Sequence, residues 1–522
     1  MTQAQQTTAP SPPALEATSI RLRGDDNVVL VTEDLEPGDY TEGGGPLHVD
    51  VAVPRGHKVA TADIAEGEPV RKYGQVIGFA DRQIRRGNHV HTHNVAYRTF
   101  VREADYGADA VPTEYIPESE RATFRGIRRP DGSAATRNYL GILTTVNCSA
   151  TAAKLIAERM RGVIAENFPT VDGIVALTHG TGCGMAGPGS EGFELLRRTM
   201  TGYASHPNFA GFLVLGLGCE VNEVLQLTRT WDIPDHKLVQ AMTIQELGGT
   251  RRTVEAGTAA LKEMLPQASN VEREPISASE LVLAMECGGS DGYSGITANP
   301  ALGAAADLLI RHGGTAAFGE TPEIYGAEHL LMRRAVSDEV ADKLARRIAW
   351  WEDYTAKNNG SMDNNPSPGN KAGGLTTILE KSLGAAAKGG STNLVDVVEY
   401  AEPLRAKGLI FMDTPGYDPV NATGLVAGGA QVLCFTTGRG SAFGCSPTPS
   451  IKLATNSDVY RRMDEDMDIN CGDIADGVAS VPEKGAEIFA KILQVASGEK
   501  TFSEDLGYGQ EEFVPWQLGA TM

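Results

Sequence analysis

The segment 285–300, MECGGSDGYSGITANP, places a thiol and two carboxylates in and around a glycine-rich turn. An apolar, strand-like run ends at Glu286-Cys287, and a helix is expected to begin near Asn299. In α/β proteins, the turn between the end of a strand and the next helix is where catalytic and ligand-binding groups collect. The pattern therefore favours acid–base or metal chemistry here, although a purely structural corner explains it equally well.

Four of the seven cysteines share one sequence context, at or just past the end of an apolar run: Cys148, Cys183, Cys219 and Cys287. An odd number of cysteines at irregular spacing argues against a disulfide framework. One cysteine of this kind is more often an inert core residue. Four in the same context are harder to explain as inert core residues, whereas the other three cysteines look less patterned.

The segment HVHTHN places His89, His91 and His93 at a period of two residues. On a strand this spacing sends all three side chains to one face, which suits a metal ion or an anionic ligand. A polar strand edge that faces solvent is the alternative.

Two basic residues stand in glycine-rich loops. Arg439 lies between two glycines directly after a strand-like run, where a guanidinium group can clamp a carboxylate. An arginine that only stabilises a tight turn is the competing interpretation. Lys371 lies in NNPSPGNKAGG, which is too rich in proline, glycine and asparagine to be anything but a shaped loop.

The elements that position these residues divide the chain into five parts. Residues 1–18 are expected to be a disordered tail, and 19–98 a small all-β module of short strands and turns. Residues 99–125 are acidic and contain prolines, which predicts an ordered linker. Residues 126–270 and 271–522 alternate strands with helices, which predicts two α/β domains with mainly parallel sheets.

Parallel strands bring several candidate residues to one edge of the first of these sheets: Cys148, His179, Cys183, Cys219 and Glu220. This is the carboxyl edge, where ligands bind in open α/β sheets.

Composition excludes several classes of function. The 522 residues imply about three domains, and 67 acidic against 46 basic residues give a formal charge of -21, which argues against nucleic-acid binding. There is no long apolar run and no signal-peptide pattern, so we expect a cytoplasmic protein without membrane contact. No nucleotide-binding glycine motif with its expected context is present.

Taken together, the motifs resemble the family of altronate and galactarate dehydratases. They run in family order over residues 24–515 and include GHKVATADIAEGEPVRKYGQVIGFA, TRNYLGILTTVNCSA, VLGLGCE, ECGGSDGYSGITANP, NPSPGNKAGG, EKSLG and FTTGRGSAFG. The β module resembles the β-clip fold called the SAF domain. The resemblance implies a hydro-lyase that converts a C6 sugar acid to a 2-keto-3-deoxy acid with Fe(II) as cofactor. Altronate ranks first as substrate and galactarate second. A sulfolactate sulfo-lyase and a non-catalytic sugar-acid binding protein are the alternatives.

With this resemblance, the strand-end positions give each candidate a role. The expected acid–base groups are His179, Glu220, Glu286 and Asp291, and the expected substrate-binding residues are Lys371, Arg439, Ser290 and Asn299. The candidate metal ligands are His91, His93, Cys148, Cys183, Cys219 and Cys287.

These ligands would hold one Fe(II), with His179 as a further possible ligand, or their cysteines would hold an iron–sulfur cluster. The cluster would use Cys148, Cys183 and Cys219, or two of them with Cys287. We expect the site to lie between the two α/β domains with the histidine strand as its third wall, in a homodimer.

Overall fold

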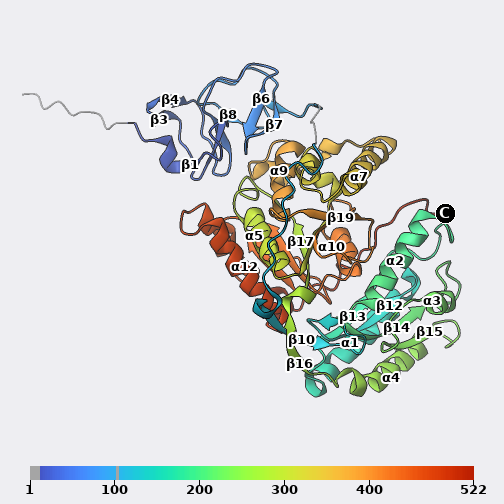
Figure 1. Ribbon diagram of the computed structural model, residues 1–522. Helices are drawn as coiled ribbons and strands as arrows, with labels where there is room; N and C mark the ends of the chain where they lie inside the picture. Colours follow the sequence, from blue (N-terminus) through green and yellow to red (C-terminus); the bar gives the residue numbers. More distant parts are fainter. Residues whose placement is uncertain (1–11, 101–104) are drawn as a thin grey trace, which may run out of the picture.

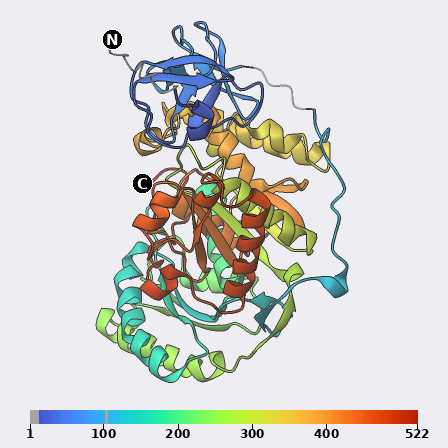
Figure 2. The same cartoon turned by 90° about the vertical axis from the view of Figure 1, so that its left-hand side faces the viewer.

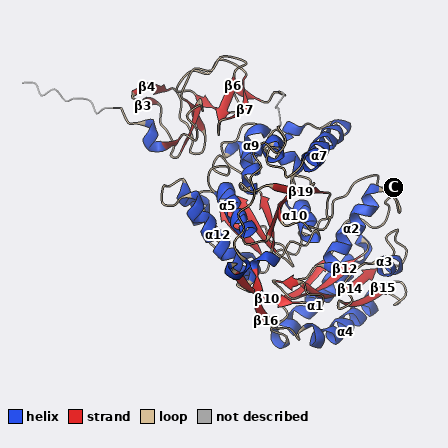
Figure 3. Ribbon diagram, in the orientation of Figure 1, coloured by secondary structure: helices blue, strands red, loops and turns tan. Residues whose placement is uncertain are grey.

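The computed structural model describes residues 12–100 and 105–522, which form three units (Figure 1). The β module lies against one end of the C-terminal α/β domain, and the middle α/β domain lies at its other end, as Figure 2 also shows. Strands of both α/β domains pair in parallel (Figure 3). The predicted fold class is confirmed.

The β module is built from short antiparallel strands around two small apolar clusters. Its four-stranded sheet has the order β1 (Ser19–Ile20), β2 (Val28–Val31), β5 (Lys58–Ala60), β8 (His89–Val90). A second sheet contains β6 (Pro69–Lys72), β7 (Gln75–Ala80) and β9 (Val95–Ala96), and β3 (Gly38–Glu42) pairs with β4 (Gly45–Val49).

The structure corrects the expected disordered tail for its last residues, while residues 1–11 lie outside the described chain. Leu15–Thr18 forms a short 3₁₀ helix, and Leu15 is fully buried with Val29 and Leu47. A single leucine in a polar, proline-rich segment shows no periodicity, so its anchoring was not visible in the sequence.

Buried charges join the β module to α9 (Ile378–Ala386) of the C-terminal domain. Lys58 Nζ lies 2.9 Å from Glu380 Oε2, and Lys72 Nζ lies 3.0 Å from Glu380 Oε1. Burial opposes ionisation of Glu380, yet the charges of the two lysines hold its pKa at about 2. The two lysines and the glutamate therefore form a charged joint between the two units.

The described part of the linker runs along the C-terminal domain. Ile116 N donates to Arg311 O at 2.8 Å, and Asp109 pairs with Arg333. The linker leads into β10 (Thr123–Arg128), which pairs with β11 (Ala134–Ala135) and β16 (Arg273–Ser277) in a small sheet between the α/β domains.

The middle domain has a parallel sheet in the order β13 (Gly173–Leu177), β12 (Tyr139–Thr144), β14 (Phe209–Gly216), β15 (Leu238–Thr243). One face packs against α1 (Ala150–Asn167) and α4 (Thr250–Ala268). The other face packs against α2 (Glu191–Ser205) and α3 (Val224–Thr230).

The C-terminal domain has a seven-stranded parallel sheet. Its order is β19 (Leu394–Val398), β20 (Gly408–Met412), β18 (Thr315–Phe318), β17 (Val282–Cys287), β21 (Val432–Thr437), β22 (Ser450–Ala454), β23 (Ile469–Asn470). One face packs against α5 (Ala298–Arg311), α7 (Asp338–Lys357) and α12 (Val481–Ala496). The remaining helices are α6 (Glu328–Met332), α8 (Pro368–Ala372), α10 (Asp418–Ala427), α11 (Ser457–Arg462) and α13 (Phe502–Leu506). Within the described residues, no helix is long and apolar enough to cross a membrane.

The two α/β domains share an apolar core in which α2 packs on α10. The C-terminal tail then crosses to the middle domain, where Met522 N donates to Gly184 O at 2.7 Å. The tail thus covers part of the carboxyl edge of the middle sheet.

Candidate active site

A pocket of about 330 Å³ opens at the carboxyl end of β17. Its volume falls at the lower end of the range typical of small-molecule sites. All residues that line it belong to the C-terminal domain: Cys287, Gly288, Gly289, Glu323, Asn364, Asn365, Ser367, Asn370, Lys381 and Asp418.

Glycine at position 288 allows Asp418 to reach the pocket. A Cβ atom on Gly288 would lie 2.3 Å from Asp418 Oδ2 and 2.5 Å from Phe435 Cζ. Gly289 has a φ of 63°, a left-handed conformation that side chains disfavour. The glycine pair after β17 therefore brings its backbone against the first residue of α10.

Two buried lysines lie among the acidic groups beneath the pocket. Lys388 Nζ is 2.8 Å from Cys287 Sγ and 2.8 Å from Glu320 Oε2. Lys381 Nζ is 2.7 Å from Glu323 Oε1.

Carboxyl groups outnumber these ammonium groups, since Glu286 and Asp418 also belong to the cluster. Full ionisation of all the carboxyl groups would leave negative charge buried without a partner, so part of the cluster holds protons at neutral pH.

Asp418 is the acidic group whose pKa best suits proton transfer. Burial, followed by the charges of Glu320 and Glu323, raises the pKa of Asp418 to about 7. Burial, with Glu320 and Asp418, raises the pKa of Glu286 well above its usual range. A carboxyl group that titrates near neutral pH can both accept and release a proton during turnover.

The predicted substrate-binding cations flank the pocket. Arg439 is exposed, and its Cβ lies 3.3 Å from the position that a Cβ on Gly289 would take. Lys371 is half-buried in α8, directly after Asn370 of the pocket wall. Neither side chain forms a hydrogen bond or ion pair with another described residue, so both remain available for an anion.

The other candidates of segment 285–300 lie beside the pocket but do not line it. Asp291 is buried and accepts hydrogen bonds from neighbouring side chains and one backbone amide: Ser294 Oγ, Thr455 Oγ1, Asn456 Nδ2 and Tyr293 N. Buried Asn299 donates to Gly384 O and accepts from Thr436 Oγ1. Ser290 is also buried, and its carbonyl oxygen accepts from Asn370 Nδ2. Glu286 is fully buried at the back of the acidic cluster.

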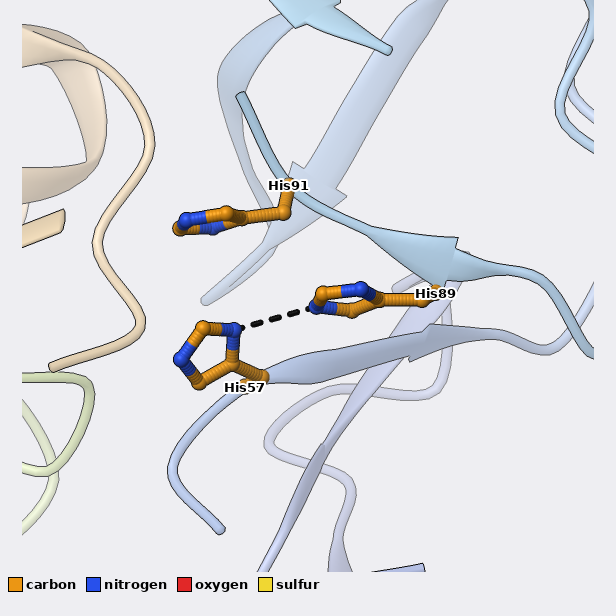
Figure 4. Close-up of side chains that lie close together, drawn as sticks. All are labelled: His57, His89 and His91. Carbon is orange, nitrogen blue, oxygen red and sulfur yellow. Dashed lines mark hydrogen bonds between the residues drawn. The ribbon is translucent and has the colours of Figure 1, made fainter. Parts of the chain in front are cut away.

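Three histidines of the β module form a second cluster (Figure 4). Nitrogen atoms of His57, His89 and His91 lie within 4.8 Å of one another, with His57 Nδ1 3.0 Å from His89 Nε2. The strand ends at Val90 because the Asn94 side chain bonds His89 O and His91 N, which turns the chain. The expected one-sided row of three histidines is therefore replaced by a turn.

His93 remains outside this set. It is exposed, with its ring 5.3 Å from that of His89. His57 takes the third position instead, and sequence reasoning missed it because 32 residues separate it from His89.

The environment of the histidine cluster suits a metal ion. Burial, followed by neighbouring positive groups, lowers the pKa of His89 to about 3 and that of His91 to about 4. The rings are therefore neutral at physiological pH, as metal ligands must be. His91 Nδ1 is buried and has no hydrogen-bond partner among the described residues. His57 Nε2 lies 3.4 Å from Ala372 O. Ala372 ends α8, the helix whose Asn370 lines the pocket.

The remaining candidates lie together at the carboxyl edge of the middle sheet. Cys148, Cys183 and Cys219 are exposed there. Both ring nitrogens of His179 contact backbone groups, at Thr144 O and Thr181 N, and Glu220 accepts from Thr145 Oγ1 and Gly218 N.

None of these middle-domain residues lines the pocket at Cys287. Among the described residues, no metal-capable group of side chains combines the two α/β domains. The structure therefore corrects the expectation of one site between these domains, because Cys287 faces Lys388 and Glu320 instead.

Sequence reasoning missed most of the acidic cluster and both of its lysines. Glu320 lies just past the end of β18, and Asp418 begins α10, the helix that follows β20, so the strand-end rule applied to Cys287 could have found both. Lys381 lies in the EKSLG motif, but Lys388 and Glu323 carry no local signal in the sequence.

Family models match all three units of the chain. They are the altronate/galactarate dehydratase SAF domain over residues 17–98, the D-galactarate dehydratase/altronate hydrolase second domain over 126–269, and the D-galactarate/altronate dehydratase C-terminal domain over 278–521. These models describe dehydratases, so the chain is a carbon–oxygen lyase with an α/β fold and a SAF module. The chain belongs to the altronate/galactarate dehydratase family.

Individual relatives agree with this assignment. The altronate dehydratase of Bacillus subtilis (strain 168) is 37% identical over 505 residues, covering 96% of this chain and 99% of the relative. The galactarate dehydratase (L-threo-forming) of Escherichia coli (strain K12) is 38% identical and covers 94% of each chain. The (2R)-sulfolactate sulfo-lyase subunit beta of Chromohalobacter salexigens is 32% identical over 77% of this chain and 99% of that subunit.

Proposed function

We propose that this chain dehydrates a C6 sugar acid to a 2-keto-3-deoxy sugar acid, with altronate as first candidate substrate and galactarate as second. The observation that carries the proposal is the pocket at the end of β17, which holds Asp418, with a pKa of about 7, together with Lys381. The altronate and galactarate relatives match nearly the full chain, β module included, which ranks both acids ahead of sulfolactate.

Dehydration of such an acid breaks a C–H bond next to the carboxylate and a C–O bond at the following carbon. A base takes the proton, an acid protonates the departing hydroxyl, and the enol product rearranges to the keto acid. We assign proton abstraction to Asp418 and protonation of the hydroxyl to Lys381, which Glu323 holds in place. Arg439 and Lys371 bind the substrate carboxylate, since both cations flank the pocket.

We assign the iron to His57, His89 and His91. Their neutral imidazoles and the unpartnered His91 Nδ1 suit Fe(II), whereas the acidic cluster already contains two ammonium groups. A bound Fe(II) would supply Lewis-acid polarisation of a substrate oxygen.

The substrate proposal is tested with a panel of hexonates and hexarates. Protein purified without oxygen is incubated with Fe(II) and each acid, and 2-keto-3-deoxy acid is measured. Altronate or galactarate should give product. Sulfite release from sulfolactate, with no keto acid from any sugar acid, would show that the proposal is wrong.

The iron assignment has a matched pair of variants. His91→Ala should lose turnover and the one Fe(II) per chain that the histidines hold, while His93→Ala should keep both because His93 lies outside the ligand set. Iron retained in His91→Ala but lost in Glu320→Gln would move the metal to the acidic cluster.

A further inference from the structure

The three thiols at the edge of the middle sheet are not used by the pocket at Cys287. Cys148, Cys183 and Cys219 follow the adjacent parallel strands β12, β13 and β14. They are exposed, whereas the other four cysteines are buried. Buried cysteines behave as inert core residues, whereas these three exposed thiols on neighbouring loops are candidate metal ligands.

Hydrogen bonds between backbone and asparagine groups lock the three loops together. Asn147 N donates to Thr181 O at 3.0 Å, and Asn222 N donates to Gly182 O at 3.2 Å. The Asn222 side chain closes the set by donating to Thr145 O at 3.0 Å. Each of the three cysteines lies within three residues of one of these bonds, so the loops cannot move independently.

Two glycines allow the backbones of these three loops to lie close together. Gly182 has a φ of 98°, and a Cβ there would lie 2.2 Å from Thr145 O. Gly218, directly before Cys219, has a φ of 121°. Glu220 holds this turn by accepting from Gly218 N and Thr145 Oγ1. The two glycines and Glu220 therefore fix the conformation of loops whose thiols are exposed.

The spacing of the thiols argues against a single shared ion. Two thiolates on one zinc ion lie about 4 Å apart, because each Zn–S bond is about 2.3 Å. Across the described chain, the three sulfur atoms do not fall within 4.8 Å of one another. An iron–sulfur cluster accepts wider spacing, because each thiolate binds a different iron atom.

We propose that Cys148, Cys183 and Cys219 hold an iron–sulfur cluster of the [4Fe–4S] type at this edge of the middle domain, apart from the pocket and the histidine cluster. Each thiol releases its proton to solvent as its sulfur bonds one iron, so binding involves no change of oxidation state. The fourth iron has no protein thiolate.

Two further contacts suit such a cluster. Gln245 Nε2 lies 3.4 Å from Cys219 Sγ, and hydrogen bonds to ligand sulfur tune the reduction potential of iron–sulfur centres. The C-terminal tail bonds Gly184, next to Cys183, through Met522 N. The end of the tail therefore lies beside Cys183.

The test measures iron and acid-labile sulfide in the full-length protein, purified without oxygen and reconstituted with iron and sulfide. About four sulfide ions per chain are expected for a [4Fe–4S] cluster. Cys183→Ser should lose nearly all the sulfide, whereas the control Cys287→Ser should keep it. Absence of sulfide from reconstituted wild type, or loss in Cys287→Ser but not in Cys183→Ser, would overturn the proposal.

A second measurement does not depend on how the variants fold. Iodoacetamide should alkylate all three thiols after the cluster is removed with a chelator, and none of them in the loaded protein. Equal alkylation in both states would contradict the proposal. Asp418→Asn separates this proposal from the proposed function, since it should lower turnover strongly while leaving the sulfide content unchanged.

Discussion

Burial beside Glu320 and Glu323 places the pKa of Asp418 close to neutral pH. As the base, Asp418 acts in its ionised form, whose fraction rises as the pH passes through about 7. We therefore expect kcat to rise over this range in wild type. Asp418→Asn should lower kcat by about 10²–10⁴-fold and remove this rise in the pH–rate profile. A profile that keeps its shape in the variant would assign the base to another residue.

The same pKa shift predicts an effect on stability. The folded protein binds a proton at Asp418 more tightly than the unfolded chain, so stability falls as the pH rises from about 4 to about 7. Asp418→Asn removes this loss. Its Tm should match that of wild type at pH values below the window and exceed it above. If the difference in Tm between the variant and wild type is the same below and above this pH range, Asp418 is not the group whose pKa is raised.

Gly288 offers a steric test of the same geometry. Gly288→Ala would place a methyl group 2.3 Å from Asp418 Oδ2, so the carboxyl group must move. Turnover should fall by about 10²-fold or more, because small displacements of a catalytic group are costly. Gly162→Ala in α1 is the matched control, since nothing lies within 4 Å of its added Cβ, and it should keep full activity.

At the level of elements, the joint between the β module and α9 depends on one glutamate. Glu380→Gln would leave the buried Lys58 and Lys72 without their counter-charge, and breaking such a group costs about 3–5 kcal/mol. Denaturant unfolding should show this loss at neutral pH. Exposed Glu66 on the same module provides the control, because Glu66→Gln should change stability by less than about 0.5 kcal/mol.

The joint also predicts an acid dependence. The pKa of Glu380 is about 2 in the folded protein and lies below its unfolded value, so its stabilisation is present above about pH 4 and is lost as the pH falls toward 2. Wild type should lose stability over this range more steeply than Glu380→Gln. Parallel curves for the two proteins would contradict the role of the joint.

Local sequence patterns predict where some helices begin but not where a helix is interrupted. Serine is a preferred N-cap residue, and Ser337 caps α7 by accepting from Val340 N. The segment before α7 does not form one continuous helix but is divided into a 3₁₀ turn (Thr321–Glu323) and α6. Glu320, the residue before this turn, adopts a left-handed conformation with a φ of 69°. Local helical spacing does not reveal such a break, because contacts with the acidic cluster hold Glu320 in place.

Across the whole molecule, docking of the β module brings the histidine cluster to the loop that lines the pocket. Fe(II) bound there should stabilise the folded protein by about 2.7 kcal/mol when its concentration is 100 times Kd. Protein prepared without added Fe(II) should show no turnover and a lower Tm, and added Fe(II) should restore both. His91→Ala should show no shift in Tm with Fe(II). A shift of wild-type size in that variant would exclude the histidine cluster as the iron site.

By itself, the sequence determined the α/β class, the SAF-like module, the family and the chemistry-bearing ends of individual strands, because these depend on short-range periodicity and turn residues. Only the tertiary structure decided which of these residues meet. His57 joins His89 through strand pairing, and Cys287 meets Lys388 across a sheet edge. The four cysteines with the same local pattern lie at two different sheets, three at the middle sheet and Cys287 at the C-terminal sheet. A strand end places a residue at the carboxyl edge of its own sheet, but the sequence does not show which sheet carries the pocket.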